Sequence, residues 1–259
     1  MLSERRLPVR VVKLGGNELD RPGWLPQAAA AVAGAGPVVV VHGGGAAVNA
    51  MSQRLGLAVE KRDGLRVTTP EIMAVVEMVL TGPVNRGVVA ALRTAGVDAV
   101  GLAGADGGLL TAEPAPGNLG QVGRITAVRT GLLHSLLLAG LTPVVAPVAP
   151  GADGGGTVFN VNADDAAAAV AGALRATELL QISDVPGVLV DGSVAPSLAD
   201  ADIEGLIARG VVSGGMAAKL RAAAVALAQG ARAVRIGGLA LLTDANAGTR
   251  VLAAALEPA

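Results

Sequence analysis

Two glycine turns, each directly after a short apolar run, are the first features of this sequence that could bind an anion. Lys13-Leu14 leads into Gly15-Gly16, and Val41-His42 leads into Gly43-Gly44-Gly45. Glycines let backbone N–H groups approach a phosphate, and a helix that starts after such a turn adds its N-terminal dipole. Together the two turns predict a cradle for a polyphosphate. A simpler interpretation stays open, because glycine turns connect strands to helices in any α/β fold.

Lysine is rare in this chain, and its positions are informative. Of 20 lysine and arginine residues, only Lys13, Lys61 and Lys219 are lysine. Lys13 precedes the first glycine turn, and Lys219 follows another turn at Gly214-Gly215. An ammonium group is a compact point charge, so these two positions favour neutralisation of a phosphoryl group. Chance placement would produce the same pattern.

Two further segments carry side chains suited to a small polar substrate. Asn160, Asn162 and Asp164 alternate between a predicted strand and a predicted helix, where Asn162 or Asp164 could instead cap the helix. Arg66 follows the turn Asp63-Gly64, and its planar guanidinium could bind a carboxylate through two hydrogen bonds. An exposed arginine without such a role is the common alternative.

The composition excludes several classes of function. The chain has 259 residues, a formal net charge of −1, no cysteine and 1% aromatic residues. A disulfide scaffold, a thiol nucleophile and a Cys-ligated zinc site are therefore excluded, and nothing favours binding to nucleic acid or to an acidic membrane. The sequence has neither a P-loop pattern nor a strand-linked G-x-G-x-x-G pattern. His42 and His134 are too few for a His-rich metal site, and we interpret both as structural residues.

The basic residues near the N-terminus are not followed by an apolar segment, so the sequence does not predict a signal peptide. The most apolar stretch, 132–148, is interrupted by glycine and proline and is too short for a spanning helix. We therefore expect a cytoplasmic protein.

Apolar runs and Ala-rich segments alternate along the chain in a strand and helix rhythm. The longest helix is expected to be interrupted at Gly82-Pro83, and segments 121–128 and 157–159 are interpreted as hairpin pieces at the rim of the sheet. The alternation predicts an α/β fold with a largely parallel sheet. Strands are predicted at 9–14, 37–41, 99–102, 143–146, 178–182 and 233–236, and helices at 25–33, 46–55, 69–95, 130–139, 163–173, 203–209 and 216–229.

Six segments, in order and spacing, resemble the acetylglutamate kinase family of amino acid kinases. They are Lys13-Leu14-Gly15-Gly16, Val41-His42-Gly43-Gly44-Gly45, Asp63-Gly64-Leu65-Arg66-Val67-Thr68, Asn160-Val161-Asn162-Ala163-Asp164, Asp184-Val185-Pro186-Gly187-Val188-Leu189 and Gly214-Gly215-Met216 with Lys219. Val84-Asn85 and Val100-Gly101-Leu102 agree with this resemblance, which covers nearly the whole chain. It implies a three-layer αβα sandwich with an open, mainly parallel central sheet, the carbamate-kinase-like amino acid kinase fold. It also implies an N-terminal lobe, 1–175, for acetylglutamate binding and dimerisation, and a C-terminal lobe, 176–259, for ATP binding.

The resemblance implies roles for individual residues. Lys13 and Lys219 would neutralise the transferred phosphoryl group, Asp164 would orient both lysines, and Lys61 would be peripheral. Mg²⁺ would arrive with the ATP phosphates, so no protein ligand to a metal is expected. The phosphate would be held by Gly15, Gly16, Gly43 and Gly44, the substrate by Gly44, Gly45, Arg66 and Asn160, and the nucleotide by Asp184, Val185, Gly187, Leu189, Gly214, Gly215, Met216 and Lys219.

The implied reaction is transfer of the ATP γ-phosphoryl group to the γ-carboxylate of N-acetyl-L-glutamate, a step of arginine biosynthesis. That carboxylate is already ionised at neutral pH, so positioning and charge stabilisation are sufficient. One alternative is a kinase of lysine biosynthesis that acts on aminoadipate attached to a carrier protein, for which the expected basic rim is not evident. Another is a sensor that binds nucleotide without turnover, and the presence of Lys13, Lys219 and Asp164 argues against it.

Two departures from the family pattern carry expectations of their own. The short segment between residues 236 and 243 predicts a shortened or lost helix on the nucleotide side. Few residues precede the first strand, whereas arginine-inhibited members carry an extra N-terminal helix that links dimers into hexamers. The resemblance therefore implies an arginine-insensitive homodimer, with ATP and N-acetyl-L-glutamate as small-molecule partners and no nucleic acid or membrane partner.

Overall fold

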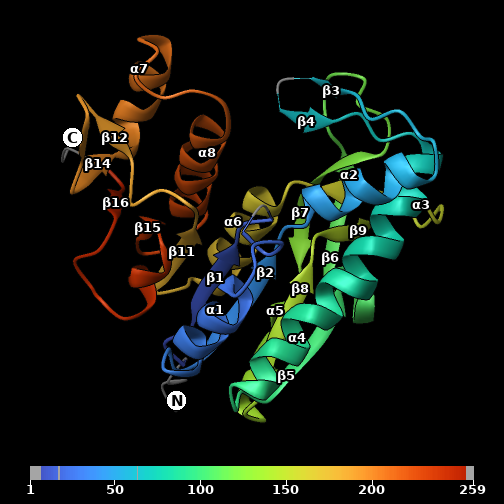
Figure 1. The fold of residues 1–259 in the computed structure, drawn as a ribbon, viewed down its shortest axis with the longest axis horizontal. Coiled ribbons are helices and arrows are strands. Elements are labelled where there is room, and N and C mark those ends of the chain that lie inside the picture. Colours follow the sequence, from blue (N-terminus) through green and yellow to red (C-terminus); the bar gives the residue numbers. More distant parts are fainter. Residues whose placement is uncertain (1–6, 17, 63, 255–259) are drawn as a thin grey trace.

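A computed structural model describes residues 7–16, 18–62 and 64–254, so Asp63 of the predicted substrate turn lies outside the described residues. An eight-stranded sheet forms the centre, in the order β14-β16-β15-β11-β1-β2-β8-β5 (Figure 1). Its neighbouring strands are parallel except β15 and β16, which confirms the predicted largely parallel sheet. The sequence pattern does not predict β14 and β16, which are short and partly exposed. The strands are β1 Arg10–Leu14, β2 Val38–His42, β5 Ala99–Ala103, β8 Thr142–Ala146, β11 Glu178–Ile182, β14 Ser197–Ala199, β15 Val234–Gly237 and β16 Thr249–Leu252.

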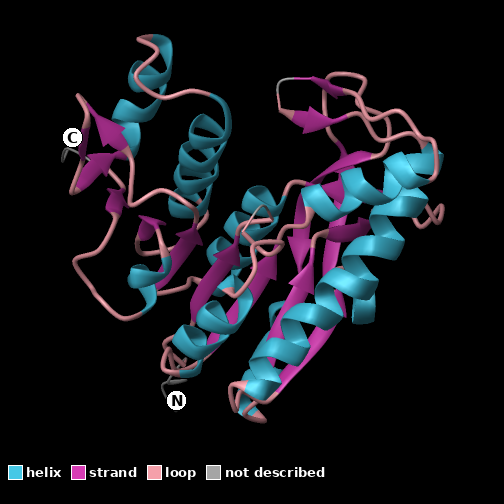
Figure 2. Cartoon of the chain, viewed as in Figure 1, coloured by secondary structure: helices cyan, strands magenta, loops and turns pink. Residues whose placement is uncertain are grey.

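Helices cover both faces of this sheet and complete the expected three layers (Figure 2). Alternate residues of a strand point to opposite faces, and in β2 Val38 and Val40 join one apolar cluster while Val39 and Val41 join the other. Helices α1 (Trp24–Ala33) and α4 (Asn85–Thr94) cover the first face. The second face is covered by α5 Thr130–Leu138, α6 Ala163–Leu174 and α8 Gly214–Ala228.

Alanine takes the place that aromatic residues hold in many cores. Helices α6 and α8 pack against each other, and most of the buried residues of α6 are alanines. Small side chains let the two helix backbones approach closely, so the chain forms its core with 1% aromatic residues.

A second, four-stranded sheet lies beside the central one, in the order β6-β7-β10-β9. The predicted hairpin pieces correspond to β7 and β10, but these two strands pair in parallel. Strand β7 pairs antiparallel with β6, and β10 pairs antiparallel with β9. The sequence pattern predicts neither β6 nor β9. The strands are β6 Leu110–Pro114, β7 Val122–Val128, β9 Val148–Pro150 and β10 Val158–Val161.

The longest helical segment is broken where the sequence predicts. Helix α3 (Pro70–Val79) continues through a π-helical turn, η1 (Leu80–Val84), into α4, and Gly82 inside the turn has non-helical backbone angles. Thr69 caps the start, because its Oγ1 accepts a hydrogen bond from Ile72 N at 3.3 Å. By length and hydropathy alone Pro70–Thr94 is apolar enough to cross a membrane, but its apolar side chains contribute to the two cores on either side of the break.

Shorter elements connect this frame. Two small hairpins stand at the rim, and helix α2 follows the second glycine turn. These elements are α2 Gly45–Arg54, β3 Lys61–Arg62, β4 Leu65–Arg66, η2 Asp106–Gly108, β12 Leu189–Val190, β13 Ser193–Val194, η3 Asp200–Asp202, α7 Ile203–Ala208 and η4 Leu239–Leu242.

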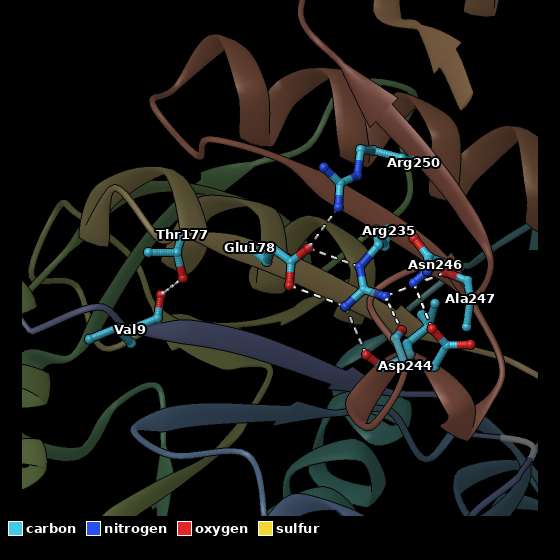
Figure 3. Close-up of polar contacts among 9 residues, drawn as sticks. Val9, Thr177, Glu178, Arg235, Asp244, Asn246, Ala247 and Arg250 are labelled. Carbon is cyan, nitrogen blue, oxygen red and sulfur yellow. Dashed lines mark hydrogen bonds and ion pairs between the residues drawn. The ribbon is translucent and has the colours of Figure 1, made fainter. Parts of the chain in front are cut away.

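A buried cation, Arg235 of β15, holds the C-terminal part of the chain against the central sheet. Its guanidinium donates to both carboxylate oxygens of Glu178, at 2.8 and 3.2 Å (Figure 3). The same guanidinium also donates to three main-chain carbonyl oxygens of the next loop, those of Leu241, Asp244 and Ala247. One side chain thus fixes the short connection after residue 236, where the structure has the single turn η4.

Candidate active site

The two glycine turns meet at one edge of the central sheet. Strands β1 and β2 are parallel neighbours, so their carboxyl ends lie side by side, and Gly43 N donates to Leu14 O at 3.0 Å. A Cβ atom on Gly16 would lie 2.5 Å from Gly44 N. Only glycine therefore permits this approach of the two backbones, which confirms that the turns form one arrangement.

A cavity of about 640 Å³ opens at this edge and brings most of the predicted site residues together. Gly187 and Leu189 do not line it. Gly187 is packed beside Thr249, where a Cβ would lie 2.8 Å from Oγ1, and Leu189 on β12 is about half exposed. The predicted residues that do line the cavity are Lys13, Gly15, Gly16, Gly43, Gly44, Gly45, Arg66, Asn160, Asp164, Asp184, Val185, Gly214, Gly215, Met216 and Lys219.

Asp164 joins the two lysines. Its Oδ1 lies 3.0 Å from Lys13 Nζ and 3.2 Å from Lys219 Nζ, and all three side chains are largely buried. Asn162 is the cap of α6, since its Oδ1 accepts from Asp164 N at 2.8 Å. Asp164 is therefore free to pair with the cations, which resolves the choice between the two possible capping residues.

Burial and charge act against each other in this cluster. Burial lowers the pKa of Lys13 and the nearby Lys219 lowers it further, while Asp164 opposes both. Burial alone would raise the pKa of the Asp164 carboxyl, but the two ammonium groups outweigh this and hold its pKa below the ordinary value. One carboxylate faces two ammonium groups, so the cluster has an excess of positive charge that suits an anion.

Helix α8 supplies Lys219 from the other side of the cavity. The helix begins at Gly214, whose φ of 51° lies in the left-handed region that favours glycine. Gln181 of β11 donates to Lys219 O at 3.2 Å and ties the helix to the sheet. The first turn of α8 lines the cavity with Gly214, Gly215 and Met216.

Arg66 offers an uncommitted donor. Its Nη2 donates to Gly45 O at 3.1 Å, whereas the buried Nη1 has no partner among the described residues. Burial lowers the pKa of Arg66, but a guanidinium stays cationic at any physiological pH. An unpaired buried N–H of a cation suits a carboxylate ligand. Asn160 lies in the same cavity, with its Nδ2 donating to Thr68 Oγ1 at 3.1 Å.

Sequence reasoning did not find every residue of the cavity. Glu18 is 4% exposed and its carboxylate covers Gly15, but a single glutamate after a glycine turn carries no recognisable pattern. Lys61, expected at the periphery, lines the cavity from β3. An apolar wall also contributes, formed by Val48, Val76 and Leu80. These residues would have required knowledge of how the loops fold over the sheet edge.

Metal-binding side chains do not gather here. Within residues 7–16, 18–62 and 64–254, no group of three or more His, Cys, Asp or Glu side chains could hold a metal ion. The donors of the site are two ammonium groups, backbone N–H groups and one guanidinium, which suit phosphate and carboxylate groups, and the Asp164 carboxylate is paired with the two lysines.

Comparisons with known proteins agree with this geometry. Residues 8–238 match the model of the amino acid kinase family. An acetylglutamate kinase of Chloroflexus aurantiacus is 52% identical over 246 residues, which cover 93% of this chain and 96% of that protein.

Solved structures share the fold of this chain. The protein smu.665 from Streptococcus mutans UA159 is 30% identical, with a TM-score of 0.82 over 95% of this chain and 98% of that one. An N-acetylglutamate synthase from Neisseria gonorrhoeae, solved with coenzyme A and N-acetyl-glutamate, is 25% identical with a TM-score of 0.83, over 96% of this chain and 60% of that one. The family resemblance and the fold class are confirmed, and this chain belongs to the acetylglutamate kinases of the amino acid kinase family.

Proposed function

We infer that this enzyme transfers the γ-phosphoryl group of ATP to the γ-carboxylate of N-acetyl-L-glutamate, a step of arginine biosynthesis. The observation that carries this assignment is the pairing of Asp164 with both Lys13 and Lys219, at the edge where the two glycine turns meet. Similarity to acetylglutamate kinases over nearly the whole chain supports the choice of acceptor. No feature favours a carrier-linked aminoadipate kinase or a silent sensor.

We propose that the nucleotide enters as MgATP and that its phosphates lie between the two lysines. The N–H groups around Gly15, Gly16 and Gly44 hold phosphate oxygens, while Gly43 N is bonded to Leu14 O and shapes the second turn. Lys13 and Lys219 neutralise the charge that spreads over the transferred group, and Asp164 keeps the two ammonium groups in place. The Mg²⁺ ion belongs to the substrate and bridges its phosphates.

The acceptor binds on the other side of the glycine turns. Arg66 Nη1 receives the α-carboxylate of acetylglutamate, and Asn160 forms a hydrogen bond near the substrate amide. The apolar wall of Val48, Val76 and Leu80 faces the acetyl group. The γ-carboxylate attacks phosphorus in its ionised form, so the reaction needs alignment and no general base.

In this proposal residues 1–175 form the acceptor lobe and residues 176–259 the nucleotide lobe. Asp184, Val185, Gly214, Gly215 and Met216 line the nucleotide side of the cavity. Gly187 and Leu189 do not line the cavity and have no role in this proposal. The central sheet is continuous across the division, because β11 pairs with β1.

We further propose a cytoplasmic homodimer. The resemblance to the family is the basis of the dimer, and Leu138 at 74% exposed and Met78 at 50% are single apolar side chains that a second copy would cover. Light scattering on a size-exclusion column gives the mass in solution, and a monomer at micromolar concentration would contradict the dimer.

The decisive experiment is steady-state ADP release with MgATP and a choice of acceptors. N-acetyl-L-glutamate is expected to support turnover, whereas N-acetylaminoadipate and free glutamate are expected to support far less. Nucleotide binding without turnover on any acceptor would instead indicate a sensor. Turnover only with a carrier-linked substrate would indicate the lysine pathway.

A further inference from the structure

His42 is a buried polar residue that the proposed reaction does not use. It ends β2 directly before the second glycine turn, and its side chain is completely buried. Its Nδ1 lies 2.7 Å from Gly43 O, and its Nε2 lies 3.0 Å from Asn85 Nδ2. Both ring nitrogens are therefore committed.

Asn85, the first residue of α4, determines which ring nitrogen carries the proton. Its Nδ2 also donates to Val144 O, at 2.9 Å, so both hydrogens of the amide are used. Since Asn85 donates to Nε2, that nitrogen must be the unprotonated acceptor. The proton then sits on Nδ1, which donates to Gly43 O.

A glycine in the neighbouring strand makes room for the amide. A Cβ on Gly101, in the middle of β5, would lie 2.0 Å from Asn85 Oδ1. Glycine weakens a strand interior, and close approach of another group is a common reason for it. Gly101, Asn85 and His42 thus form a chain from the sheet to the glycine turn.

The hydrogen bond to Gly43 O orients a group in the cavity. The carbonyl of Gly43 and the N–H of Gly44 belong to one peptide unit, and in a trans peptide they point in opposite directions. The described peptide bonds are all trans. With Gly43 O held toward the buried histidine, the Gly44 N–H points away from the histidine, and Gly44 N lies at the contact with Gly16, where both glycines line the cavity.

We propose that His42 and Asn85 are positioning residues that hold the Gly43–Gly44 peptide so that the Gly44 N–H faces the phosphoryl group. This inference rests on the proposed function. Without the imidazole donor, Gly43 O would lose its buried partner, and rotation of the peptide would turn a carbonyl dipole toward the phosphates. A histidine that only fills the core would have no such effect on the cavity.

The tautomer can be measured on the intact protein without any turnover. The chain has two histidines, so ¹⁵N-histidine labelling gives two imidazole rings, and His134→Gln assigns them. His42 is expected to carry its proton on Nδ1, with Nε2 unprotonated, at neutral pH. In Asn85→Leu the bias toward this tautomer is expected to weaken. A proton on Nε2 in the unsubstituted protein would overturn the proposal.

Function is tested with a matched pair of substitutions. His42→Asn places an amide N–H close to the position of Nδ1, whereas His42→Leu fills the space without a donor. His42→Leu is expected to lower both kcat and the affinity for a non-hydrolysable ATP analogue, with kcat about 100-fold lower, and His42→Asn to retain most of both. The KM for the acceptor is expected to change little in either variant.

A control removes a comparable bond far from the cavity. Thr177 Oγ1 donates to Val9 O at 3.1 Å at the opposite ends of the strands (Figure 3). Thr177→Val is expected to leave kcat and analogue binding unchanged. Equal losses in His42→Leu and His42→Asn, or no loss in folded His42→Leu, would overturn the positioning role. If the unsubstituted protein binds the analogue but phosphorylates no acceptor, the proposed function fails while the tautomer and binding results still decide this inference.

Discussion

Lys13 Nζ and Asp164 Oδ1 lie 3.0 Å apart, although the two residues come from different elements, strand β1 and the first turn of helix α6. Lys219 reaches the same oxygen from helix α8. In this arrangement a single carboxylate, that of Asp164, holds two buried ammonium groups close together. Without ligand the cluster carries an uncompensated positive charge, and a phosphate that neutralises this charge makes the cluster more favourable.

Replacement of Lys219 by arginine tests whether a compact ammonium is required. Lys219→Arg keeps the charge, but a planar guanidinium cannot occupy the same point beside Asp164. We expect kcat to fall about 100-fold or more while the fold is retained, because an interaction made in the transition state is lost. Steady-state ADP release and circular dichroism measure the two quantities.

The matched control for this change lies on the same helix. Arg221 is exposed and pairs with Glu204, away from the cavity. Arg221→Lys exchanges the same two residue types and is expected to leave kcat within about twofold, as surface substitutions generally do. Near-normal turnover in Lys219→Arg would remove Lys219 from the mechanism.

Replacement of Arg66 tests the acceptor site. Arg66→Met removes the buried Nη1 that has no partner in the described chain. A hydrogen bond to a charged group contributes about 1.5–3 kcal/mol, so the KM for acetylglutamate is expected to rise about 10- to 100-fold. The KM for MgATP should change much less.

Arg62 provides the comparison for Arg66. It lies on the neighbouring strand β3, is exposed and pairs with Glu60. Arg62→Met is expected to leave both KM values close to those of the unsubstituted enzyme. A similar rise in the KM for acetylglutamate in both variants would point to general electrostatic attraction rather than a bond at Arg66.

The predictable part of the site is the part that regular elements position. Apolar runs that end in glycine define where β1 and β2 stop, and parallel neighbours bring those ends to one edge. Lys13 and Gly43 could therefore be placed from the sequence. Asp164 follows from the same logic, because the helix that starts after Asn162 must present its first turn to that edge.

The unpredicted part depends on contacts between distant segments. Glu18 reaches the cavity only because its loop folds back over Gly15, and no periodicity encodes that path. Strand β9 has three residues and ends in Pro150, so its sequence looks like a turn. Only its pairing with β10 identifies it as a strand. Gly187 matches a nucleotide motif but packs beside Thr249, a partner far away in the sequence.

Burial of His42 predicts a pH dependence of stability. Burial lowers the pKa of His42 to about 4, against an ordinary value of 6.5, and its polar neighbours Gly43 O and Asn85 do not titrate. Between these two values the unfolded chain binds a proton that the folded protein does not. The free energy of unfolding therefore falls as the pH drops from 6.5 toward 4, by about 3 kcal/mol.

Urea unfolding at pH 7 and pH 4.5 measures this loss, and His42→Asn separates it from the titration of carboxyl groups. The variant has no imidazole at this position, so its stability is expected to change less between the two pH values. An equal change in both proteins would assign the acid sensitivity to groups other than His42. Asp164 contributes little in this range, because its lowered pKa removes stability only below about pH 4. Burial raises the pKa of Asp165 to about 6, so its protonation adds stability as the pH falls and opposes the loss from His42 in both proteins.

Replacement of Arg235 tests what holds the loop after β15 and Glu178 of β11 together. Arg235→Met keeps the length of the side chain but leaves Glu178 without its main partner and three carbonyls without a donor (Figure 3). Breaking a buried ion pair by removing one member is expected to lower the free energy of unfolding by about 3–5 kcal/mol, as urea unfolding would measure. Arg250 also approaches Glu178, at 3.9 Å, but its side chain is 44% exposed. Arg250→Met should therefore cost less than about 1 kcal/mol, and equal losses in the two variants would show that the carbonyl contacts of Arg235 contribute nothing.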